Sequence, residues 1–488
     1  MHSLRRSRSP YSFRLAACVV VVTLAGGAAP IVAADPAVWR VAATVAVITP
    51  DEPMYLAGFG DRVVPAEGTA MDLRAKCLAV EDAEGRRFLL LTLDLIDVPR
   101  QLRDALERRL ATKHGLPPAS LLVNCSHTHC GPELRYRDEE LAELDPQRAE
   151  RCRRYNRRLL DAASQLIDDA LAGLAPARLS YGHARCGFAM NRRLKSDRPD
   201  GDPYLNRPNP DGVVDHDVPV LKVETLDGRL AAVAFGYACH NTTLRLTRYH
   251  ADYAGHAQAM IEREHPGATA LFVMGCGGDQ NGYPRSRPEF SEVHGRSLAT
   301  AVEAALGATM RPLAGPLRTA YAAATLDYQP APSIERLEAR LATGAEYPAA
   351  NAEYERAWDR RRLDALSRNT LPRTYDAPVQ VVRFGDGLTL AALPGETVVD
   401  YSLRLKRELA HLPAVWIAGY SNDVFAYIPS RRVLVEGGYE ASRAMMYLTN
   451  PVQPGPFEPS VEDRLLGTVR ELLAQTAAPA PAASTTSR

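Results

Sequence analysis

Residues 124–133 read NCSHTHCGPE and carry two histidines, His127 and His129, with one residue between them. The apolar segment 121–123 in front of them predicts a strand, and the Gly-Pro pair behind them predicts that regular structure stops there. In extended backbone, residues i and i+2 point to the same side, so both imidazoles are expected to face one spot at the end of that strand. By itself a His-x-His pair is a weak indication of a metal site, because loop histidines are more often hydrogen-bonded than metal-bound.

Other strand-like segments of the chain also end in polar residues. The segments 229–238, 269–274, 388–393 and 415–418 are apolar and are followed by His240, Asp279, Glu396 and Asn422. Helical periodicity occurs between such segments, as in Leu102, Leu106 and Leu110. We therefore predict an α/β fold, with a mixed β-sheet core flanked by helices and the active site at the strand ends.

Turn residues and composition predict the remaining organisation. Short turns with glycine predict three hairpins, formed by 76–80 with 88–95, 218–224 with 229–238, and 379–384 with 388–393. Residues 189–215 are rich in Asn, Pro, Asp and Gly and predict a long loop, which in a compact domain is often functional. The charged stretch 333–371 predicts a solvated helical pair.

The two ends of the chain differ from the rest. Residues 1–34 combine several arginines, an apolar run at Leu15–Leu24 and small residues before Asp35, which predicts a secretory signal and hence export to the periplasm, the cell surface or the medium. Residues 35–475 are expected to form the catalytic domain. Residues 476–488 are rich in Ala, Pro, Ser and Thr and predict a disordered tail.

Charge and cysteine content exclude some classes of protein. The 58 basic and 58 acidic residues balance, which argues against a broad nucleic-acid-binding surface. Seven cysteines remain after residue 34, without a Cys-x-x-Cys pair, so neither a disulfide framework nor a structural zinc ribbon is expected. One or two disulfides stay open, and neither their pairing nor the oligomeric state can be inferred from the residues.

The strand-end residues suggest hydrolytic metal chemistry. Two histidines and a glutamate, here His127, His240 and Glu396, are a known ligand set for catalytic zinc. Such an ion activates a bound water and polarises a carbonyl, which suits hydrolysis of an amide or an ester. Singly, each residue also has an ordinary explanation: His240 as a buried, hydrogen-bonded histidine, and Glu396 as an acid at a helix N-terminus.

Several motifs together resemble those of the neutral, non-lysosomal ceramidases. They are SHTHCGP at 126–132, PGE at 394–396, Asn422-Asp423 followed by Tyr427-Ile428, and YEAS at 439–442, within a resemblance that spans about Val41 to Gln475. The resemblance implies zinc ligands at His127, His240, Glu396 and Tyr427. It also implies active-site roles for His129, for Arg192 in the Asn191-Arg192 motif, and for Tyr439. Asp279 and Asp423 are expected to orient the ligands.

The chain departs from this family at two places. Where the ceramidases have Gly-Asp-x-Ser-Pro-Asn, residues 278–283 read GDQNGY, so Asn281 occupies the position of the serine. Asn281 cannot act as a nucleophile, which favours attack by a metal-bound water, but its amide can donate a hydrogen bond to an oxyanion. The sequence stops at residue 488 without the family's C-terminal immunoglobulin-like domain, so the substrate need not be ceramide.

These observations lead to one main hypothesis and two alternatives. The main one is a secreted zinc-dependent amidohydrolase that acts on a ceramide-like or other N-acylated substrate, a small molecule or a lipid, with peripheral contact to a membrane allowed. The first alternative is an exported zinc-containing binding protein without turnover, suggested by the missing serine. The second is a zinc esterase or deacetylase that acts on sugars, which the same metal chemistry permits.

Overall fold

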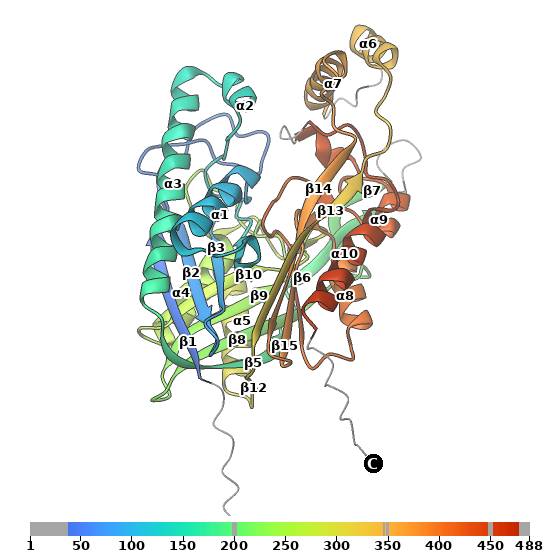
Figure 1. Cartoon of the computed structure of the whole chain (residues 1–488). Helices are drawn as coiled ribbons and strands as arrows, with labels where there is room; N and C mark the ends of the chain where they lie inside the picture. Colours follow the sequence, from blue (N-terminus) through green and yellow to red (C-terminus); the bar gives the residue numbers. More distant parts are fainter. Residues whose placement is uncertain (1–37, 198–202, 345–346, 348–350, 448–451, 478–488) are drawn as a thin grey trace, which may run out of the picture. The chain divides into compact units, whose positions relative to one another are not determined.

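Two β-sheets pack face to face between layers of helices in the computed structural model of the chain (Figure 1). The structure describes residues 38–197, 203–344, 347, 351–447 and 452–477. The expected secretory signal and all but the first two residues of the expected tail lie outside these ranges. Within the described residues, no helix has both the length and the apolar character needed to span a membrane.

The larger sheet has nine strands in the order β10-β9-β8-β5-β1-β2-β3-β4, with β12 paired to β5. Their bounds are β1 Trp39–Val47, β2 Arg74–Glu81, β3 Arg87–Leu93, β4 Leu121–Cys125, β5 Ala175–Arg185, β8 Asp217–Thr225, β9 Leu230–Tyr237, β10 Thr269–Met274 and β12 Arg311–Leu313. Most neighbours are antiparallel, but β3 with β4 and β9 with β10 are parallel. The carboxyl ends of β4 and β9, which precede His127 and His240, therefore belong to parallel pairs.

The smaller sheets complete the β-structure. A four-stranded sheet has the order β13-β14-β15-β17, a three-stranded one β11-β6-β7, and a two-stranded one β16-β18. Their bounds are β6 Ala189–Lys195, β7 Tyr204–Asn209, β11 Gln280–Gly282, β13 Leu317–Asp327, β14 Thr374–Phe384, β15 Leu388–Ala392, β16 Glu396–Thr397, β17 Val415–Ala418 and β18 Tyr427–Ile428. The mixture of parallel and antiparallel pairs confirms the predicted α/β class with mixed sheets.

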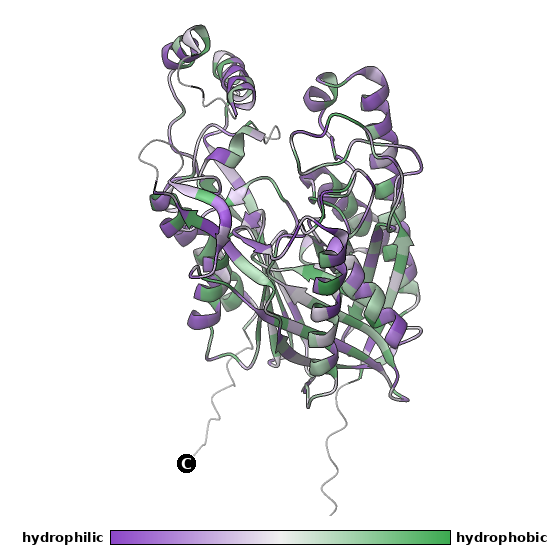
Figure 2. Ribbon diagram, turned by 180° about the vertical axis from the view of Figure 1, so that it is seen from behind, coloured by the Kyte–Doolittle hydropathy of each residue, from purple (hydrophilic) through white to green (hydrophobic). Residues whose placement is uncertain are grey.

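Helices cover the outer faces of both large sheets. The helices of the described residues are α1 Arg100–His114, α2 Asp138–Ala142, α3 Pro146–Ala172, α4 Asp252–Glu264, α5 Pro288–Leu306, α6 Ile334–Thr343, α7 Ala352–Ser367, α8 Val399–Glu408, α9 Arg431–Glu436 and α10 Val461–Gln475, with 3₁₀ turns η1 Pro118–Ser120 and η2 Arg443–Tyr447. Helices α1, α3, α4 and α5 share an apolar core with the nine-stranded sheet, and α8 and α10 share another with the four-stranded sheet. The pair α6 and α7 stands apart at the upper left of Figure 2, with a mainly hydrophilic surface.

A third apolar core joins the two sheets. It contains Trp39 and Phe88 from the nine-stranded sheet and Phe384 and Trp416 from the four-stranded sheet, all at most 2 % exposed. Along the strands, side chains that enter this core alternate with side chains that point to the outer helices. This is the pattern of sheets buried on both sides. This packing holds the strand ends of both sheets at one edge.

Asn124 on β4 ties three strand ends together at that edge. Its amide nitrogen donates to Gly419 O at 2.8 Å and to Met274 O at 3.3 Å, and its oxygen accepts from Met274 N at 2.8 Å. The strands β10 and β17 therefore end beside β4, although their residues lie about 150 and 295 positions further along the chain. Because the side chain is fully buried, losing these bonds would leave several polar groups without partners.

Several predicted elements are confirmed by the structure, and one is wrong. The three hairpins are the pairs β2–β3, β8–β9 and β14–β15, and the charged stretch contains α6 and α7. The expected long loop 189–215 instead contains β6 and β7, which pair antiparallel and add β11 as a third strand. Arg192 is therefore held on a strand rather than at the start of a loop. All seven cysteines after residue 34 are buried and free, so the disulfides left open do not form.

Candidate metal centre

His127 and His240 reach one place from the ends of β4 and β9. The predicted convergence of His127 and His129 is correct, but the expected reason for it is wrong. The backbone at His127 is not extended: it has a φ of 59°, in the left-handed region. This turn brings the Nε2 atoms of His127 and His129 to 3.2 Å from each other. His127 and His240 are 3 % and 1 % exposed.

Backbone carbonyls determine the tautomers of His127 and His240. Nδ1 of His127 lies 2.5 Å from Ile96 O, and Nδ1 of His240 lies 2.8 Å from Gly277 O. Because a carbonyl oxygen can only accept, Nδ1 carries the hydrogen in both rings. Burial, with the nearby Arg192 guanidinium, lowers the pKa of His240 to about 4, so the ring is neutral near pH 7. Its Nε2 then offers a lone pair.

Glu396 places a carboxylate between these two rings. Its Oε2 lies 3.2 Å from Nε2 of His127 and 3.1 Å from Nε2 of His240. Burial opposes ionisation of this carboxyl, but the two histidines hold its pKa well below the usual value. Glu396 begins β16, which runs parallel to β18 with Glu396 opposite Tyr427. These two short strands thus place Glu396 and Tyr427 beside the histidines.

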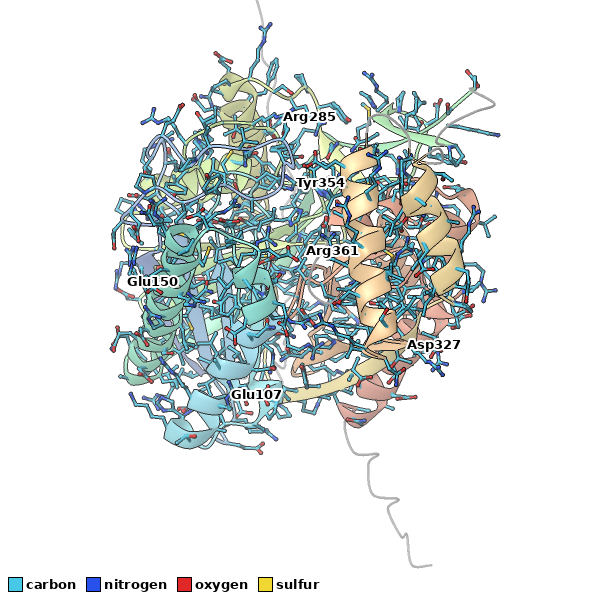
Figure 3. The ribbon with its side chains drawn as sticks, turned by 90° about the horizontal axis from the view of Figure 1, so that it is seen from above. Glu107, Glu150, Arg285, Asp327, Tyr354 and Arg361 are labelled. Carbon is cyan, nitrogen blue, oxygen red and sulfur yellow. The ribbon has the colours of Figure 1, made fainter. Side chains whose placement is uncertain are left out.

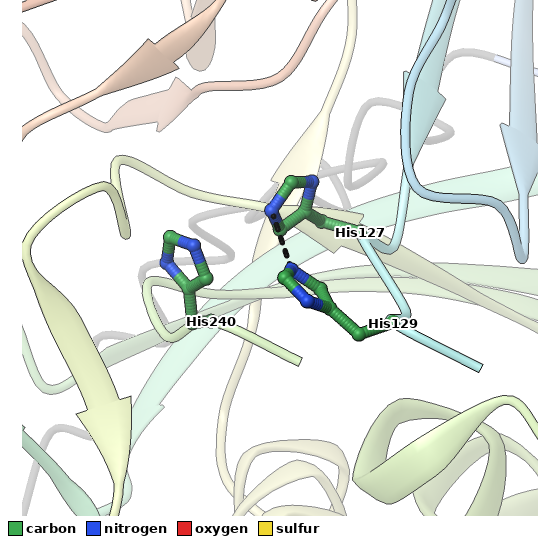
Figure 4. A group of neighbouring side chains, drawn as sticks. All are labelled: His127, His129 and His240. Carbon is green, nitrogen blue, oxygen red and sulfur yellow. Dashed lines mark hydrogen bonds between the residues drawn. The ribbon is translucent and has the colours of Figure 1, made fainter. Parts of the chain in front are cut away.

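The three histidines form a group that could hold a metal ion (Figure 4). One ring nitrogen from each of His127, His129 and His240 lies within 4.8 Å of the others. Burial and the neighbouring rings of His127 and His240 lower the pKa of His129 well below its usual value. Nδ1 of His129 is buried without a hydrogen-bond partner.

Tyr427 and Tyr420 add two hydroxyl groups to the cluster. The Tyr427 hydroxyl lies 3.2 Å from Nε2 of His240 and accepts from Arg192 Nη2 at 3.0 Å. Burial and Glu396 raise its pKa well above the usual value. Tyr420 was not predicted; its hydroxyl donates to Glu396 Oε2 at 3.3 Å. The available signal was its place at the end of β17, where residues 419–423 read GYSND.

Arg192 is surrounded by partners. Its Nε donates to Glu440 Oε1 at 2.8 Å, and its Nη1 donates to Asn281 Oδ1 at 3.4 Å. Glu440 also accepts from Arg193 at 2.6 Å, so two arginines share one buried carboxylate. Arg192, Asn281 and Tyr427 thus lie together. Glu440 was quoted only within the YEAS motif, and its role as an arginine partner was missed.

Tyr439 lies next to this group, whereas Asp279 and Asp423 have other partners. The Tyr439 ring centroid is 5.4 Å from that of Tyr427. Asp279 accepts from Val399 N at 2.8 Å, at the start of α8, and Asp423 pairs with Arg100 at 2.7 Å. Neither carboxylate is hydrogen-bonded to a predicted metal ligand, so both fix the loops that carry the ligands rather than the ligands themselves.

The donor set fits a metal ion. Nε2 of His240 is a lone-pair donor, Nε2 of His127 is likewise free of hydrogen when the ring is neutral, and both face the same oxygen of Glu396. When both rings are neutral, three acceptors face one another with no proton between them, and they repel one another unless a cation lies among them. At zinc–ligand distances of about 2.0–2.1 Å, tetrahedral ligand atoms lie about 3.3–3.4 Å apart, close to the 3.1–3.2 Å found here.

Comparison with known proteins identifies the fold. No protein-family model matches the chain, and no curated protein matches it. The chain does match solved structures, among them neutral ceramidase from Pseudomonas aeruginosa, with a TM-score of 0.64 and 19 % identity, and a ceramidase complexed with C2, with a TM-score of 0.65 and 18 % identity. Each match covers 92 % of this chain and 77 % or 78 % of the other. The fold of this chain is therefore that of neutral ceramidase, as its motifs indicated.

Proposed function

We propose that the protein is an exported zinc-dependent hydrolase of amide bonds in a ceramide-like or other N-acylated substrate. One observation carries the proposal: Nε2 atoms of two imidazoles, each oriented by a backbone carbonyl, face one oxygen of a buried carboxylate. Metal-binding histidines characteristically donate their second ring N–H to such an acceptor. A structural histidine pair has no need for this arrangement.

In this proposal His127, His240, Glu396 and Tyr427 hold the ion. A zinc ion in that place supplies a Lewis acid that polarises a carbonyl and lowers the pKa of water to about 7. His129 is the fifth donor of the cluster, and we assign it to proton transfer because its Nε2 approaches His127 rather than Glu396. Its lowered pKa leaves the ring neutral near pH 7, which is the form that can accept a proton, but the same lowering weakens it as a base.

Three further side chains are assigned to the substrate. Arg192 keeps a permanent positive charge beside the Tyr427 hydroxyl, where negative charge on an amide oxygen would develop. Asn281 accepts from Arg192 through Oδ1, and its amide nitrogen donates to Asn206 Oδ1 and to the Tyr283 hydroxyl, both at 3.4 Å; the amide has to turn before it can donate to the same oxygen. Tyr439 presents an aromatic ring beside Tyr427. With asparagine in place of the family's serine, this assignment has no covalent intermediate on residue 281.

The proposed substrate class rests on the likeness to neutral ceramidase and on the donor set. A ceramidase acts on an N-acylated lipid, and an amide is the bond for which a Lewis acid and a proton acceptor are suited. Export remains part of the proposal through residues 1–34. The alternatives are a zinc protein without turnover, which differs from the main proposal in catalysis, and an esterase or deacetylase of sugars, which differs from it in the substrate.

Metal content and turnover measured together test the proposal. Glu396→Gln removes the shared carboxylate, and we expect it to lose zinc, whereas His129→Ala should keep zinc and lose turnover. Inductively coupled plasma mass spectrometry measures the metal, and a panel of N-acyl amides, simple esters and N-acetyl sugars measures turnover with and without chelator.

Each result points to one alternative. Chelator-sensitive turnover of the amides supports the proposal, and turnover of the sugars or esters alone would replace it with the deacetylase. Zinc with no turnover in the wild type would identify a binding protein. Loss of zinc from His129→Ala but not from Glu396→Gln would mean that the three histidines, and not Glu396, hold the metal.

A further inference from the structure

A short loop, residues 57–64, packs directly on His129. A Cβ atom built on Gly58 would lie 2.2 Å from Nδ1 of His129, so only glycine fits there. The Phe59 ring meets the His129 ring edge-on, with centroids 4.9 Å apart. Arg62 donates to the backbone oxygen of His129, to Ala57 O at 2.6 Å and to Leu246 O at 2.8 Å. This site loop is therefore one wall beside the proposed proton-transfer residue.

A row of tyrosines forms a second wall. Ring centroids are 5.4 Å apart from Tyr427 to Tyr439, 6.3 Å from Tyr439 to Tyr447, and 4.8 Å from Tyr447 to Tyr354. The row begins at a proposed metal ligand and ends on α7. Tyrosine rings combine an apolar face with a polar edge, so such a wall can contact an acyl chain or an amide.

Tyr354 joins the two walls. Its hydroxyl donates to Gly60 O of the site loop at 2.5 Å, over a separation of 294 residues. A Cβ on Gly60 would lie 2.5 Å from that hydroxyl oxygen, so the contact is tight. Seen from above, Tyr354 lies between α7 and the half of the molecule that contains α1 and α3 (Figure 3). The site loop beside His129 and the tyrosine row that begins at Tyr427 therefore meet at Tyr354.

The helical arm that carries Tyr354 is lightly attached. Helix α6 buries Leu337 alone among its described residues, and α7 buries three, of which Asp359 and Arg362 pair with each other inside the arm. Polar bonds fix α7 to the segments below it, such as Arg361 to Met446 O at 3.0 Å. An element with few buried apolar contacts opens more readily than the core does.

We propose that Tyr354 is a specificity-determining residue that restricts the length of the acyl group admitted to the site. The inference rests on the proposed function, because it concerns the acyl group of that amide. The contact between Tyr354 and Gly60 joins the two walls, so a long acyl chain that runs between them has to separate them, whereas an acetyl group is too short to reach the contact. Hydrolysis of a long-chain amide therefore includes the loss of this hydrogen bond.

Substitution of Tyr354 by phenylalanine tests this role. We expect Tyr354→Phe to raise kcat/KM for an N-dodecanoyl aminocoumarin about 3- to 10-fold relative to the N-acetyl compound, the range expected for one neutral hydrogen bond. Amide hydrogen exchange at residues 57–64 should rise in the same variant. Tyr347→Phe is the matched control, since the Tyr347 hydroxyl bonds to Asp359 inside the arm at 2.8 Å and should change neither quantity.

The outcomes separate this inference from the proposed function. An unchanged dodecanoyl-to-acetyl ratio with raised exchange, or equal effects of both variants, would overturn the role of Tyr354 and leave the hydrolase intact. If the wild type hydrolyses neither amide, the proposed function fails. In that case, calorimetry of dodecanoate and acetate binding tests the role of Tyr354 instead. Tighter dodecanoate binding by Tyr354→Phe than by the wild type supports the restriction of acyl length, and unchanged binding contradicts it.

Discussion

The floor of the candidate site and its rim are built in different ways. The floor, made of His127, His240, Glu396 and Tyr427, is at most 8 % exposed and is held by backbone carbonyls, by the β16–β18 pair and by Arg192. The rim consists of the site loop, where Val63 is 78 % exposed, and of the arm α6–α7, which buries few residues. The contrast indicates that the candidate metal site is held rigidly, whereas the access of a ligand to that site can vary.

The largest effect is expected from a change in the floor. His240→Ala removes a nitrogen that faces both Glu396 and Tyr427, and we expect loss of zinc and a fall in kcat/KM of roughly 10³-fold or more. His265→Ala is the matched control, because His265 pairs with Glu303 away from the cluster. Turnover retained by a metal-free His240→Ala protein would remove the basis for a metal-dependent floor.

A change where the rim touches the floor should have an intermediate effect. Gly58 has a φ of 93°, and an alanine there would collide with His129; we expect kcat to fall roughly 10- to 100-fold through displacement of that ring. Gly85→Ala shares the backbone strain, since Gly85 has a φ of 80°, but a Cβ there meets nothing within 4 Å. Gly58→Ala should lose more stability than Gly85→Ala in thermal unfolding, because only its Cβ collides with a neighbour, and Gly85→Ala should keep full activity. Equal activity of the two would show that the loop does not position His129.

The smallest effect concerns stability next to the floor. Asp97 follows Ile96, whose carbonyl orients His127, and lines a cavity of about 330 Å³. Burial raises the pKa of its carboxyl from 3.8 to about 7, and its Oδ1 has no hydrogen-bond partner. The folded state therefore keeps a proton that the unfolded state releases, so stability falls as the pH rises from about 4 to 7.

Asp97→Asn should remove this pH-dependent loss of stability. We expect a melting temperature a few degrees above that of the wild type at pH 8, a difference that vanishes near pH 4, and unchanged zinc content. Differential scanning calorimetry across this range measures it, with Asp161→Asn on the exposed face of α3 as the control. A lower melting temperature at pH 8 would mean that the ionised carboxylate has a stabilising partner in the folded protein.

Short-range patterns predict much of the fold, but not the elements whose composition is unusual. Alternating or continuous apolar segments identified β9, β10 and β15 and the hairpins that contain two of them. Strand β13 reads LRTAYAAATLD, and its alanines favour a helix as much as a strand, so tertiary packing decides its state. Strands β6 and β7 are rich in Asn, Arg and Pro, which is the composition of a loop.

The candidate site could be predicted in part for a similar reason. His127, His240 and Glu396 each follow an apolar strand, so their type and position indicated a ligand set before any fold was known. Their convergence depends on β16 and β18, two strands of two residues each, which are too short to leave a periodic signal. Tyr420 carries no signal apart from its place after a strand, and an isolated tyrosine there is usually a core residue.

The hydrogen bonds of Asn124 have a consequence for how the protein unfolds. This side chain connects the strand before His127 to the ends of β10 and β17, and thus to the segments that lead into Asp279 and Tyr420. Separating the two sheets at this edge would disperse the donor atoms at the same moment. If the proposed ion is bound, heating should therefore release it and melt the sheets in one cooperative transition, with no folded but metal-depleted species accumulating on the way.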